Sequence, residues 1–367
     1  MKILFLGDYS NLHACIAAEL RRRGHYVNVV SDKGKYMETH ADTHLFRTPG
    51  LSGGIKYMYR LMNLLPEWKG YDIVQLINPN FLHLRPGKIK YFFDRIREQN
   101  GSMFLTLASN DYFFVKACYD ASLFRFSEFK IGKNPTRFQE EKPERMYGWI
   151  SDHNLRWNSY LYEKIDGAMS VLPEYDMAAR PILGERLRFT NLPIDISTLP
   201  YSPLSTEGKI RIFIGLKEGM EMQKGTDRLL NIAREIEKEM PDQVLVEEAR
   251  NLSLKEYIDR MSQSHIVLDQ LYSYSPATNA LQAMALGKIA ASGAQPEYYD
   301  YIGNPAARPI IPLSPLDNDI KGTLCKYILD RETLTAMSRE GRKLVETHND
   351  VRTIADKFIS HWERFGK

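Results

Sequence analysis

An α/β fold of two doubly wound domains that face a cleft is predicted by three observations. The chain has 367 residues, which is enough for two domains of ordinary size. Short apolar runs alternate with helical patterns in both halves, as is typical of parallel sheets covered by helices. A polar stretch rich in proline, residues 191–208, separates the halves and is typical of a linker.

The first half opens on a strand over residues 2–7, which a polar loop joins to a helix. Leu12, Ile16 and Leu20 recur at helical spacing in that helix. Arginines followed by Gly24 end it, because the last carbonyls of a helix favour both cations and a glycine. Further strands are predicted over residues 26–30, 71–77, 102–107 and 167–172, with a helix over 86–99.

The same pattern restarts after the linker. A strand over residues 209–215 precedes a charged amphipathic helix over 227–239, which Pro241 ends. A helix of small residues over 278–286 is closed by Gly287. Short strands are predicted over 244–246, 265–268 and 289–291, and helices over 331–347 and 351–365.

Charge and cysteine content exclude several classes of protein. The 49 basic and 46 acidic residues give a net charge of +3, which is too small for nucleic-acid binding by the field of the chain. Cys15, Cys118 and Cys325 are far apart, so we expect neither a zinc site nor a disulfide framework, and reduced thiols in a cytoplasmic protein. The N-terminal apolar run is too short for a signal peptide, and no stretch is long enough for a membrane span.

Common cofactor and hydrolase motifs are absent from the sequence. The first loop, residues 7–12, lacks the GxGxxG of dinucleotide binding, and no Walker, HExxH or GxSxG motif occurs. Dehydrogenase, NTPase, zinc-protease and serine-hydrolase interpretations therefore have no support. Two doubly wound domains instead suit a ligand held in a cleft, where strand ends and helix N-termini favour phosphate.

Three segments of the second half carry the candidate chemistry. Lys217 follows a strand, and Lys224 with Gly225 stands where a helix begins, so a phosphate there would meet a cation and the helix dipole. A hydroxyl-rich loop then leads into a helix containing Ala-Met-Ala-Leu-Gly, and Gly293-x-x-Pro296-Glu297 follows the next strand. The alternatives are an exposed lysine at a helix start, an ordinary strand–loop–helix connection and a helix cap.

In this order, Lys-Gly-x-Asp, Ala-Met-Ala-x-Gly and Gly-x-x-Pro-Glu resemble the donor domain of retaining glycosyltransferases of the GT-B fold, group-1 type. The segment 191–195, Asn-Leu-Pro-Ile-Asp, is similar to that family's Asn-Gly-x-Asp segment. The resemblance is strongest over residues 209–300 and weakest over 35–165. Two family glutamates eight residues apart are replaced here by Tyr274 and Gln282.

The resemblance implies two Rossmann-like domains that transfer a sugar from a nucleotide diphosphate sugar to an acceptor hydroxyl, with retention of configuration and without a metal. No cofactor is implied, because the nucleotide sugar is a co-substrate. Residues 1–196 would form the acceptor-side domain, with an aromatic insertion at about 112–162. Residues 197–350 would form the nucleotide-sugar donor domain, and the C-terminal helix, 351–367, would pack back on the N-terminal domain.

The resemblance also implies roles for single residues. Lys217 and Lys224 are the expected catalytic cations for the leaving diphosphate. The alternative for His13 is a half-buried surface histidine, and the alternative for Asp111 is a helix cap. The expected donor-binding residues are Gly7, Gly225, Tyr274, Ser275, Pro276, Ala277, Thr278, Asn279, Gln282 and Glu297, and the expected acceptor-side residues are Asn11, His13, Asn110 and Asp111.

Charge and aromatic rings are unevenly distributed. Residues 1–200 hold 27 basic and 22 acidic side chains, a balance of +5, whereas residues 201–367 hold 22 and 24, a balance of −2. Rings are dense between residues 91 and 162 and predict contact with a glycan or glycolipid acceptor. A weak contact with the inner face of a membrane is an alternative use of them, and an amphipathic helix with Ile89, Phe92, Phe93 and Ile96 in the core is another.

Three functions are compatible with the sequence. The first is an active glycosyltransferase in the synthesis of a cell-envelope or exported polysaccharide. The second is a degenerate GT-B protein that binds a nucleotide sugar or acts as a scaffold without transfer, as the replacements at Tyr274 and Gln282 would allow. The third is a sugar-nucleotide epimerase or phosphorylase of related fold.

Overall fold

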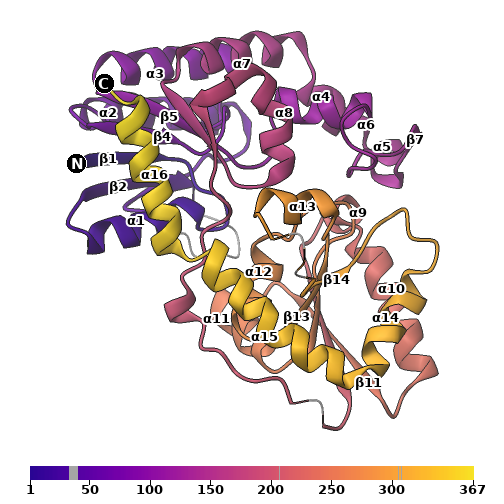
Figure 1. Ribbon diagram of the computed structural model, residues 1–367. Coiled ribbons are helices and arrows are strands. Elements are labelled where there is room, and N and C mark those ends of the chain that lie inside the picture. The colour runs from indigo at the N-terminus through magenta and orange to yellow at the C-terminus, as the bar shows by residue number, and fades with distance from the viewer. Residues whose placement is uncertain (33–39, 206, 305, 307) are drawn as a thin grey trace. The chain divides into compact units, whose positions relative to one another are not determined.

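The computed structural model describes residues 1–32, 40–205, 207–304, 306 and 308–367, and the chain divides into two compact units (Figure 1). The N-terminal unit comprises residues 1–116, 147–193 and 351–367, and the C-terminal unit comprises residues 117–146 and 194–350. Each unit is built around a parallel sheet, so the α/β class predicted from the sequence is confirmed.

The N-terminal unit contains a seven-stranded parallel sheet with the order β3-β2-β1-β4-β5-β8-β9. Its central strands are buried along their length because helices cover both faces. Its elements are β1 (Lys2–Leu6), α1 (Leu12–Arg22), β2 (Tyr26–Asp32), β3 (Thr43–Leu45), α2 (Gly50–Leu64), η1 (Leu65–Glu67), β4 (Ile73–Leu76), α3 (Pro86–Glu98), β5 (Ser102–Leu107), α7 (Asp152–Lys164), β8 (Gly167–Ser170), α8 (Pro173–Leu183), η2 (Gly184–Arg186), β9 (Leu187–Phe189) and α16 (Val351–Phe365).

Helices cover this sheet in two layers. Figure 1 shows α3 beside α7 on one face and α1 beside α16 on the other, in agreement with the contacts between these pairs. On α3, Ile89, Phe92, Phe93 and Ile96 are completely buried. The core-facing alternative for this helix is therefore correct, and these rings are structural.

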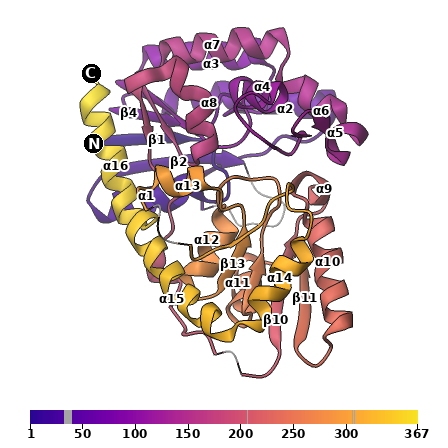
Figure 2. The ribbon, with the colours of Figure 1, turned by 45° about the vertical axis from the view of Figure 1, so that its right-hand side comes forward.

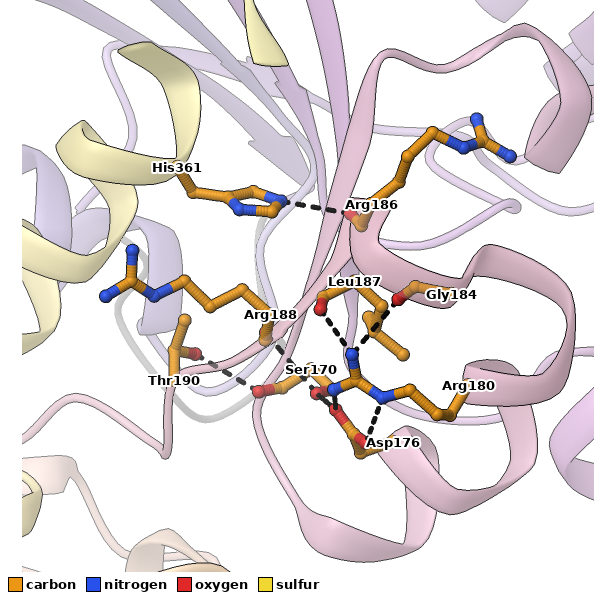
Figure 3. A network of polar contacts seen from close by, with 9 residues as sticks. All are labelled: Ser170, Asp176, Arg180, Gly184, Arg186, Leu187, Arg188, Thr190 and His361. Atoms are coloured by element: carbon orange, nitrogen blue, oxygen red, sulfur yellow. Dashed lines mark hydrogen bonds and ion pairs between the residues drawn. The ribbon is translucent and has the colours of Figure 1, made fainter. Parts of the chain in front are cut away.

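The C-terminal helix α16 belongs to the N-terminal unit. The indole N–H of Trp362 donates to the side-chain oxygen of Gln75 on β4 at 2.9 Å, and the ring is 1% exposed. His361 Nε2 lies 3.0 Å from the carbonyl oxygen of Arg186, at the margin of the polar network around β8 and β9 (Figure 3). In that network Arg180 donates to the buried carboxylate of Asp176.

The C-terminal unit contains a five-stranded parallel sheet with the order β11-β10-β12-β13-β14. Figure 2 shows α10 and α14 against this sheet, and the two helices contact each other. Its elements are β6 (Lys130–Ile131), β7 (Asn134–Pro135), α5 (Arg137–Glu141), η3 (Ile196–Thr198), β10 (Ile210–Leu216), α9 (Glu221–Lys224), α10 (Thr226–Glu239), β11 (Val244–Arg250), α11 (Leu254–Ser262), β12 (Ile266–Leu268), α12 (Thr278–Ala285), β13 (Ile289–Ser292), α13 (Pro296–Tyr301), β14 (Ile311–Pro312), α14 (Ile320–Leu329) and α15 (Arg331–His348).

One side of this sheet forms a core with α10. Leu229, Ala233 and Ile236 recur at helical spacing on α10 and are completely buried against Ile212 and Ile214 of β10. This apolar stripe explains why the charged sequence 226–239 folds as a helix on the sheet. Cys15, Cys118 and Cys325 are free thiols.

The division of the chain into two units places one segment in a different unit from the one that the sequence predicted. Residues 117–146 group with the C-terminal unit, although the aromatic insertion was expected to belong to the N-terminal domain. The division falls within α4 (Tyr112–Asp120) and within α6 (Pro143–Trp149). We call residues 117–146 the covering segment, because its contacts are with loops of the C-terminal unit described below.

The docking of α16 gives a test of the fold. We expect Trp362→Ala to lower the free energy of unfolding of the N-terminal unit by about 3–5 kcal/mol, because a buried ring is lost and Gln75 loses its donor. Circular dichroism in guanidinium measures it. The neighbouring exposed residue gives the control, Glu363→Ala, for which we expect a change within about 0.5 kcal/mol. Equal effects of the two substitutions would contradict this packing.

Candidate functional site

The predicted donor-binding segments meet at the carboxyl edge of the C-terminal sheet. The strand order reverses there, because β11 lies on one side of β10 and β12 on the other. Loops that leave neighbouring strands in opposite directions leave room for a ligand at such a point. The loop after β10 carries Lys217, Lys224 and Gly225, and the loop after β12 leads through Tyr274 to α12.

Two lysines supply positive charge at this edge. The side chain of Lys217 is exposed as a whole, but protein atoms around its ammonium lower its pKa, and the charge of Lys224 lowers it further. Within the described part of the chain, neither ammonium forms an ion pair with a carboxylate. Two cations that repel each other and have no counter-ion favour an anionic ligand.

Gly225 lies where the loop after β10 approaches the loop after β12. Its φ of +72° is left-handed, and a Cβ at this position would lie 2.8 Å from Cβ of Leu271 and 3.0 Å from the ring of Tyr272. The backbone N–H of Leu271 donates to the carbonyl oxygen of Lys224 at 2.9 Å. A glycine is therefore required for the lysine-bearing loop to approach the loop after β12.

The start of α12 presents backbone donors at the same edge. Ala277 precedes the helix, and no side chain in the described residues caps it. The first intrahelical bond of this turn runs from Leu281 N–H to the carbonyl oxygen of Ala277, so the N–H groups of Thr278 and Asn279 precede it. Ser275 and Pro276 are buried where the loop enters the helix. An uncapped helix N-terminus favours phosphate.

The Asn279 side chain belongs to a network below the loops rather than to an open surface. Its oxygen accepts from the hydroxyl of Tyr257 at 2.7 Å, and its amide donates to the carboxylate of Asp269 at 3.3 Å. Asp269 also accepts from the hydroxyl of Ser292 at 2.9 Å. A Cβ at Gly215 would lie 1.9 Å from the Tyr257 oxygen, so glycine is required beside it. Asp269 was not predicted as a site residue from the sequence, although its position after a buried strand was a signal.

Gln282 lies one turn further along α12 and is partly exposed. Its amide forms no hydrogen bond with any residue that the structure describes. The amide is thus able to donate to and accept from a ligand hydroxyl, but without the charge of a carboxylate.

Tyr274 is buried beneath the covering segment. Its ring stacks on Phe126 with centroids 4.7 Å apart and meets the edge of Phe124 at 5.6 Å. Its hydroxyl accepts a hydrogen bond of 2.5 Å from the backbone N–H of Arg125. With 2% of its surface exposed, Tyr274 offers little surface to a ligand, unlike the donor contact expected from the sequence.

Glu297 is engaged by the same segment. The guanidinium of Arg125 pairs with its carboxylate at 2.9 Å and donates to Gln295 at 3.2 Å, while lying 5.3 Å above the ring of Tyr274. Arg125 and Glu297 keep about half and a third of their side chains exposed. The pair therefore faces solvent and is accessible to a ligand.

The other end of the covering segment reaches the lysine-bearing loop. Gln223 on α9 donates to Glu128 at 2.9 Å, and Arg137 on α5 lies 3.3 Å from Asp227 at the start of α10. The covering segment thus contacts the loops that leave both β10 and β12. From the sequence, the rings of this segment were predicted to contact an acceptor. Nothing in the local pattern indicates which unit they pack on.

The candidate residues of the N-terminal unit also lie at a carboxyl edge, where the strand order reverses between β1 and β4. Gly7 has a φ of +81°, and a Cβ there would lie 2.2 Å from Cγ2 of Ile77. Asn11, with a φ of +59°, immediately precedes α1. A backbone free of side-chain bulk at Gly7 permits a close approach to a ligand.

His13 is completely buried, in contrast to the acceptor contact or surface position considered from the sequence. Its Nδ1 lies 2.7 Å from the carbonyl oxygen of Gly7, and its Nε2 lies 2.9 Å from the hydroxyl of Thr106 on β5. Burial lowers its pKa to about 3, so the ring is neutral at pH 7. His13 therefore positions the loop after β1, and both its nitrogens are engaged by protein atoms.

Asp111 caps the start of α4, which is the alternative to an acceptor contact that the sequence left open. Its carboxylate accepts from the backbone N–H of Phe114 at 2.8 Å and from the hydroxyl of Tyr162 at 2.5 Å, and burial raises its pKa. The carbonyl oxygen of Asn110 accepts from Asn78 at 3.0 Å. In the described residues, no three His, Cys, Asp or Glu side chains gather to form a metal site.

Comparison with known proteins identifies the fold. No family model and no curated protein matches the sequence. Among solved structures, the chain is similar to sucrose-phosphate synthase from Thermosynechococcus elongatus, with 12% identity, a TM-score of 0.63 and 99% of each chain covered. It is also similar to HepE from Anabaena in complex with UDP-glucose, with 13% identity, a TM-score of 0.61 and 99% and 100% covered. WaaG, a glycosyltransferase involved in lipopolysaccharide biosynthesis, follows with 14% identity, a TM-score of 0.57 and 98% and 99% covered.

The chain has the GT-B glycosyltransferase fold. These similarities extend over essentially the whole chain, so both units take part in them. The fold predicted from the motifs is therefore confirmed, including the half of the chain in which the sequence resemblance is weakest.

Gly225 gives a test of the contact between the two loops. Gly219 also has a positive φ, but a Cβ there would meet nothing within 4 Å. Both alanine substitutions incur the cost of a left-handed backbone, about 1–2 kcal/mol. We expect Gly225→Ala to lower the free energy of unfolding by about 1 kcal/mol or more beyond the loss caused by Gly219→Ala, since it also displaces Leu271. Urea denaturation measures the difference, and equal losses would contradict the close approach.

The burial of His13 predicts a pH-dependent effect. A folded pKa of about 3, against an ordinary 6.5, means that His13 favours folding fully above pH 6.5 and less as the pH falls toward 3. We expect His13→Gln to destabilise the protein at pH 7, and the difference from the parent to shrink by up to about 1.4 kcal/mol per pH unit below pH 6.5. Chemical denaturation between pH 7 and 4 measures it.

Thr106→Val provides the matched control for this prediction. It removes the hydroxyl that His13 contacts but keeps the imidazole, so its difference from the parent should not shrink in the same way. Asp8, whose pKa burial raises to about 6, is present in every variant, and its contribution cancels. A pH-independent effect of His13→Gln would show that the imidazole is already charged or hydrated.

Proposed function

We propose that this protein is a glycosyltransferase that moves a sugar from a nucleotide diphosphate sugar to an acceptor hydroxyl. The observation that carries the proposal is the grouping of Lys217, Lys224 and the uncapped start of α12 at one sheet edge. The fold supports it, because HepE, which is similar in structure, has been crystallised with UDP and with UDP-glucose. Uridine diphosphate is therefore the first nucleotide to test.

The charge that must be stabilised in this reaction belongs to the leaving diphosphate. As the bond from the anomeric carbon to the phosphate oxygen breaks, the acceptor oxygen bonds to that carbon and its proton passes to the departing diphosphate. Lys217 and Lys224 would neutralise the developing negative charge, together with the N–H groups of Thr278 and Asn279. Gln282 would hold the ribose, and Gly225 would keep the loop close.

Three finer features complete the proposal. The transfer retains the anomeric configuration, and it needs no metal because lysines and helix N–H groups supply the positive charge. Glu297, paired with Arg125, contacts donor hydroxyls at the open side of the site. The N-terminal unit, through Gly7 and the loop ending at Asn11, contributes to the acceptor side, and the acceptor is a glycan or glycolipid of a cell-envelope or exported polysaccharide made in the cytoplasm.

Tyr274 favours a second candidate, a protein that binds a nucleotide sugar without transferring it. The related family has a carboxylate at this position, whereas Tyr274 is stacked under Phe126 and accepts a hydrogen bond from Arg125. Product analysis separates the two candidates. A glycoside formed from a nucleotide sugar and an acceptor supports transfer, and binding without any product supports the second candidate.

Removal of either lysine tests the proposal. We expect Lys217→Ala and Lys224→Ala each to weaken UDP binding about tenfold to a hundredfold in titration calorimetry, because each removes a charge-assisted contact with phosphate. Chelation by EDTA should leave binding unchanged. The matched control is Lys238→Ala, which removes the same charge at the far end of α10, about 18 Å from its start. Equal affinities of all three variants, or no binding of any nucleoside diphosphate, would overturn the proposal.

A further inference from the structure

The outer face of α2 in the N-terminal unit carries a stripe of exposed apolar side chains. Leu51 is 83% exposed, Ile55 64%, Tyr59 69% and Met62 44%. They follow one another at spacings of four, four and three residues, which places them on a single face of the helix. Large apolar side chains in a contiguous exposed row indicate an interaction surface, unlike single exposed ones.

The opposite face of α2 fixes the helix to its unit. Tyr57 and Leu61 are completely buried, and the hydroxyl of Tyr57 accepts from the backbone N–H of His83 at 3.2 Å. At Gly53 a Cβ would lie 2.0 Å from the carbonyl oxygen of Thr48, so the preceding loop rests directly on the helix. The apolar stripe is therefore held outward by packing on the other side.

The charge on α2 is entirely positive. Lys56 and Arg60 are exposed beside the stripe, and the helix contains no acidic residue. Neither cation forms an ion pair within the described residues. Phe46, 59% exposed, and the exposed Arg47 precede the helix, and the guanidinium of Arg47 donates to the carbonyl oxygen of His83 at 2.6 Å. Long basic side chains beside an apolar face can reach lipid phosphates while their stems stay in contact with apolar surface.

We propose that this face of α2, with Phe46, docks on a bilayer that contains anionic lipid. An apolar stripe flanked by cations on a helix that lies flat is the pattern of an interfacial helix, which inserts its apolar face at the level of the headgroups. A second copy of this chain fits less well, because a two-fold contact between α2 stripes would set Lys56 and Arg60 of each copy near the same cations of the other. No described helix is long and apolar enough to cross a membrane.

This surface is not the one expected from the sequence. The rings between residues 91 and 162 were considered for membrane contact, but Phe124, Phe126 and Trp157 are at most 3% exposed and pack inside the protein. Tyr91 and Tyr147 of that stretch are 45% and 54% exposed, but they lie on different helices, α3 and α6. The apolar stripe of α2 lies outside that stretch. It was not singled out from the sequence, because an amphipathic pattern does not tell which face is covered.

Vesicle binding tests the proposal without any nucleotide, so its outcome does not depend on the proposed function. We expect the protein to co-sediment with phosphatidylcholine vesicles containing half phosphatidylglycerol, more weakly with pure phosphatidylcholine, and less in high salt. Ile55→Asp with Tyr59→Asp should weaken binding about tenfold or more per side chain. Lys56→Glu with Arg60→Glu should weaken it about fivefold or more per cation.

A matched variant of equal exposure separates the α2 stripe from apolar surface in general. Leu329 is 58% exposed on α14 of the C-terminal unit, and Leu329→Asp should leave vesicle binding unchanged. Circular dichroism confirms that each variant is folded. Absence of binding by the parent, or equal binding by the α2 variants, would overturn the proposal. A dimer that becomes a monomer with the aspartates in sedimentation velocity, without vesicle binding, would assign the face to a second copy.

Discussion

The buried carboxylate of Asp269 constrains the whole carboxyl edge of the C-terminal sheet. It is 3% exposed and is satisfied only when Ser292 at the end of β13 and Asn279 at the start of α12 both reach it. A buried carboxylate without these donors would cost several kcal/mol, so the strand ends and the helix are held in one arrangement. The loop from Asp269 to Thr278, which completes the candidate phosphate site with Lys217 and Lys224, is therefore anchored at both ends.

Tyr274 and the covering segment are complementary to each other. The covering segment buries position 274 beneath Phe124 and Phe126, where a carboxylate would lose hydration, and a tyrosine instead supplies a stacking ring and an acceptor for the backbone of Arg125. Arg125 then balances the charge of Glu297. Tyr274 and Glu297 are thus both contacted by Arg125, which comes from a segment distant in the sequence.

Periodicity and end signals predicted most strands of the two parallel sheets and the helices α1, α3, α10, α12, α15 and α16, but not the helices α2, α7, α8, α11 and α14. The strands and helices around α1, α3, α10 and α12 follow from apolar spacing, Gly24 and Gly287, and the lysine-bearing loop was located because it follows a buried strand. The parts that escaped prediction depend on contacts between distant residues. No local sequence pattern predicts three of these contacts. They are the pairing of His13 with Thr106, the network of Asp269 and the packing of residues 117–146 on the C-terminal unit.

The central claim is that the C-terminal unit holds the diphosphate of a nucleotide sugar between Lys217, Lys224 and the start of α12. A crystal structure of the protein with UDP tests it most directly. The account predicts phosphate oxygens within hydrogen-bond distance of both lysine ammonium groups and of the backbone N–H groups of Thr278 and Asn279. Phosphates bound elsewhere, with these groups facing solvent, would contradict it.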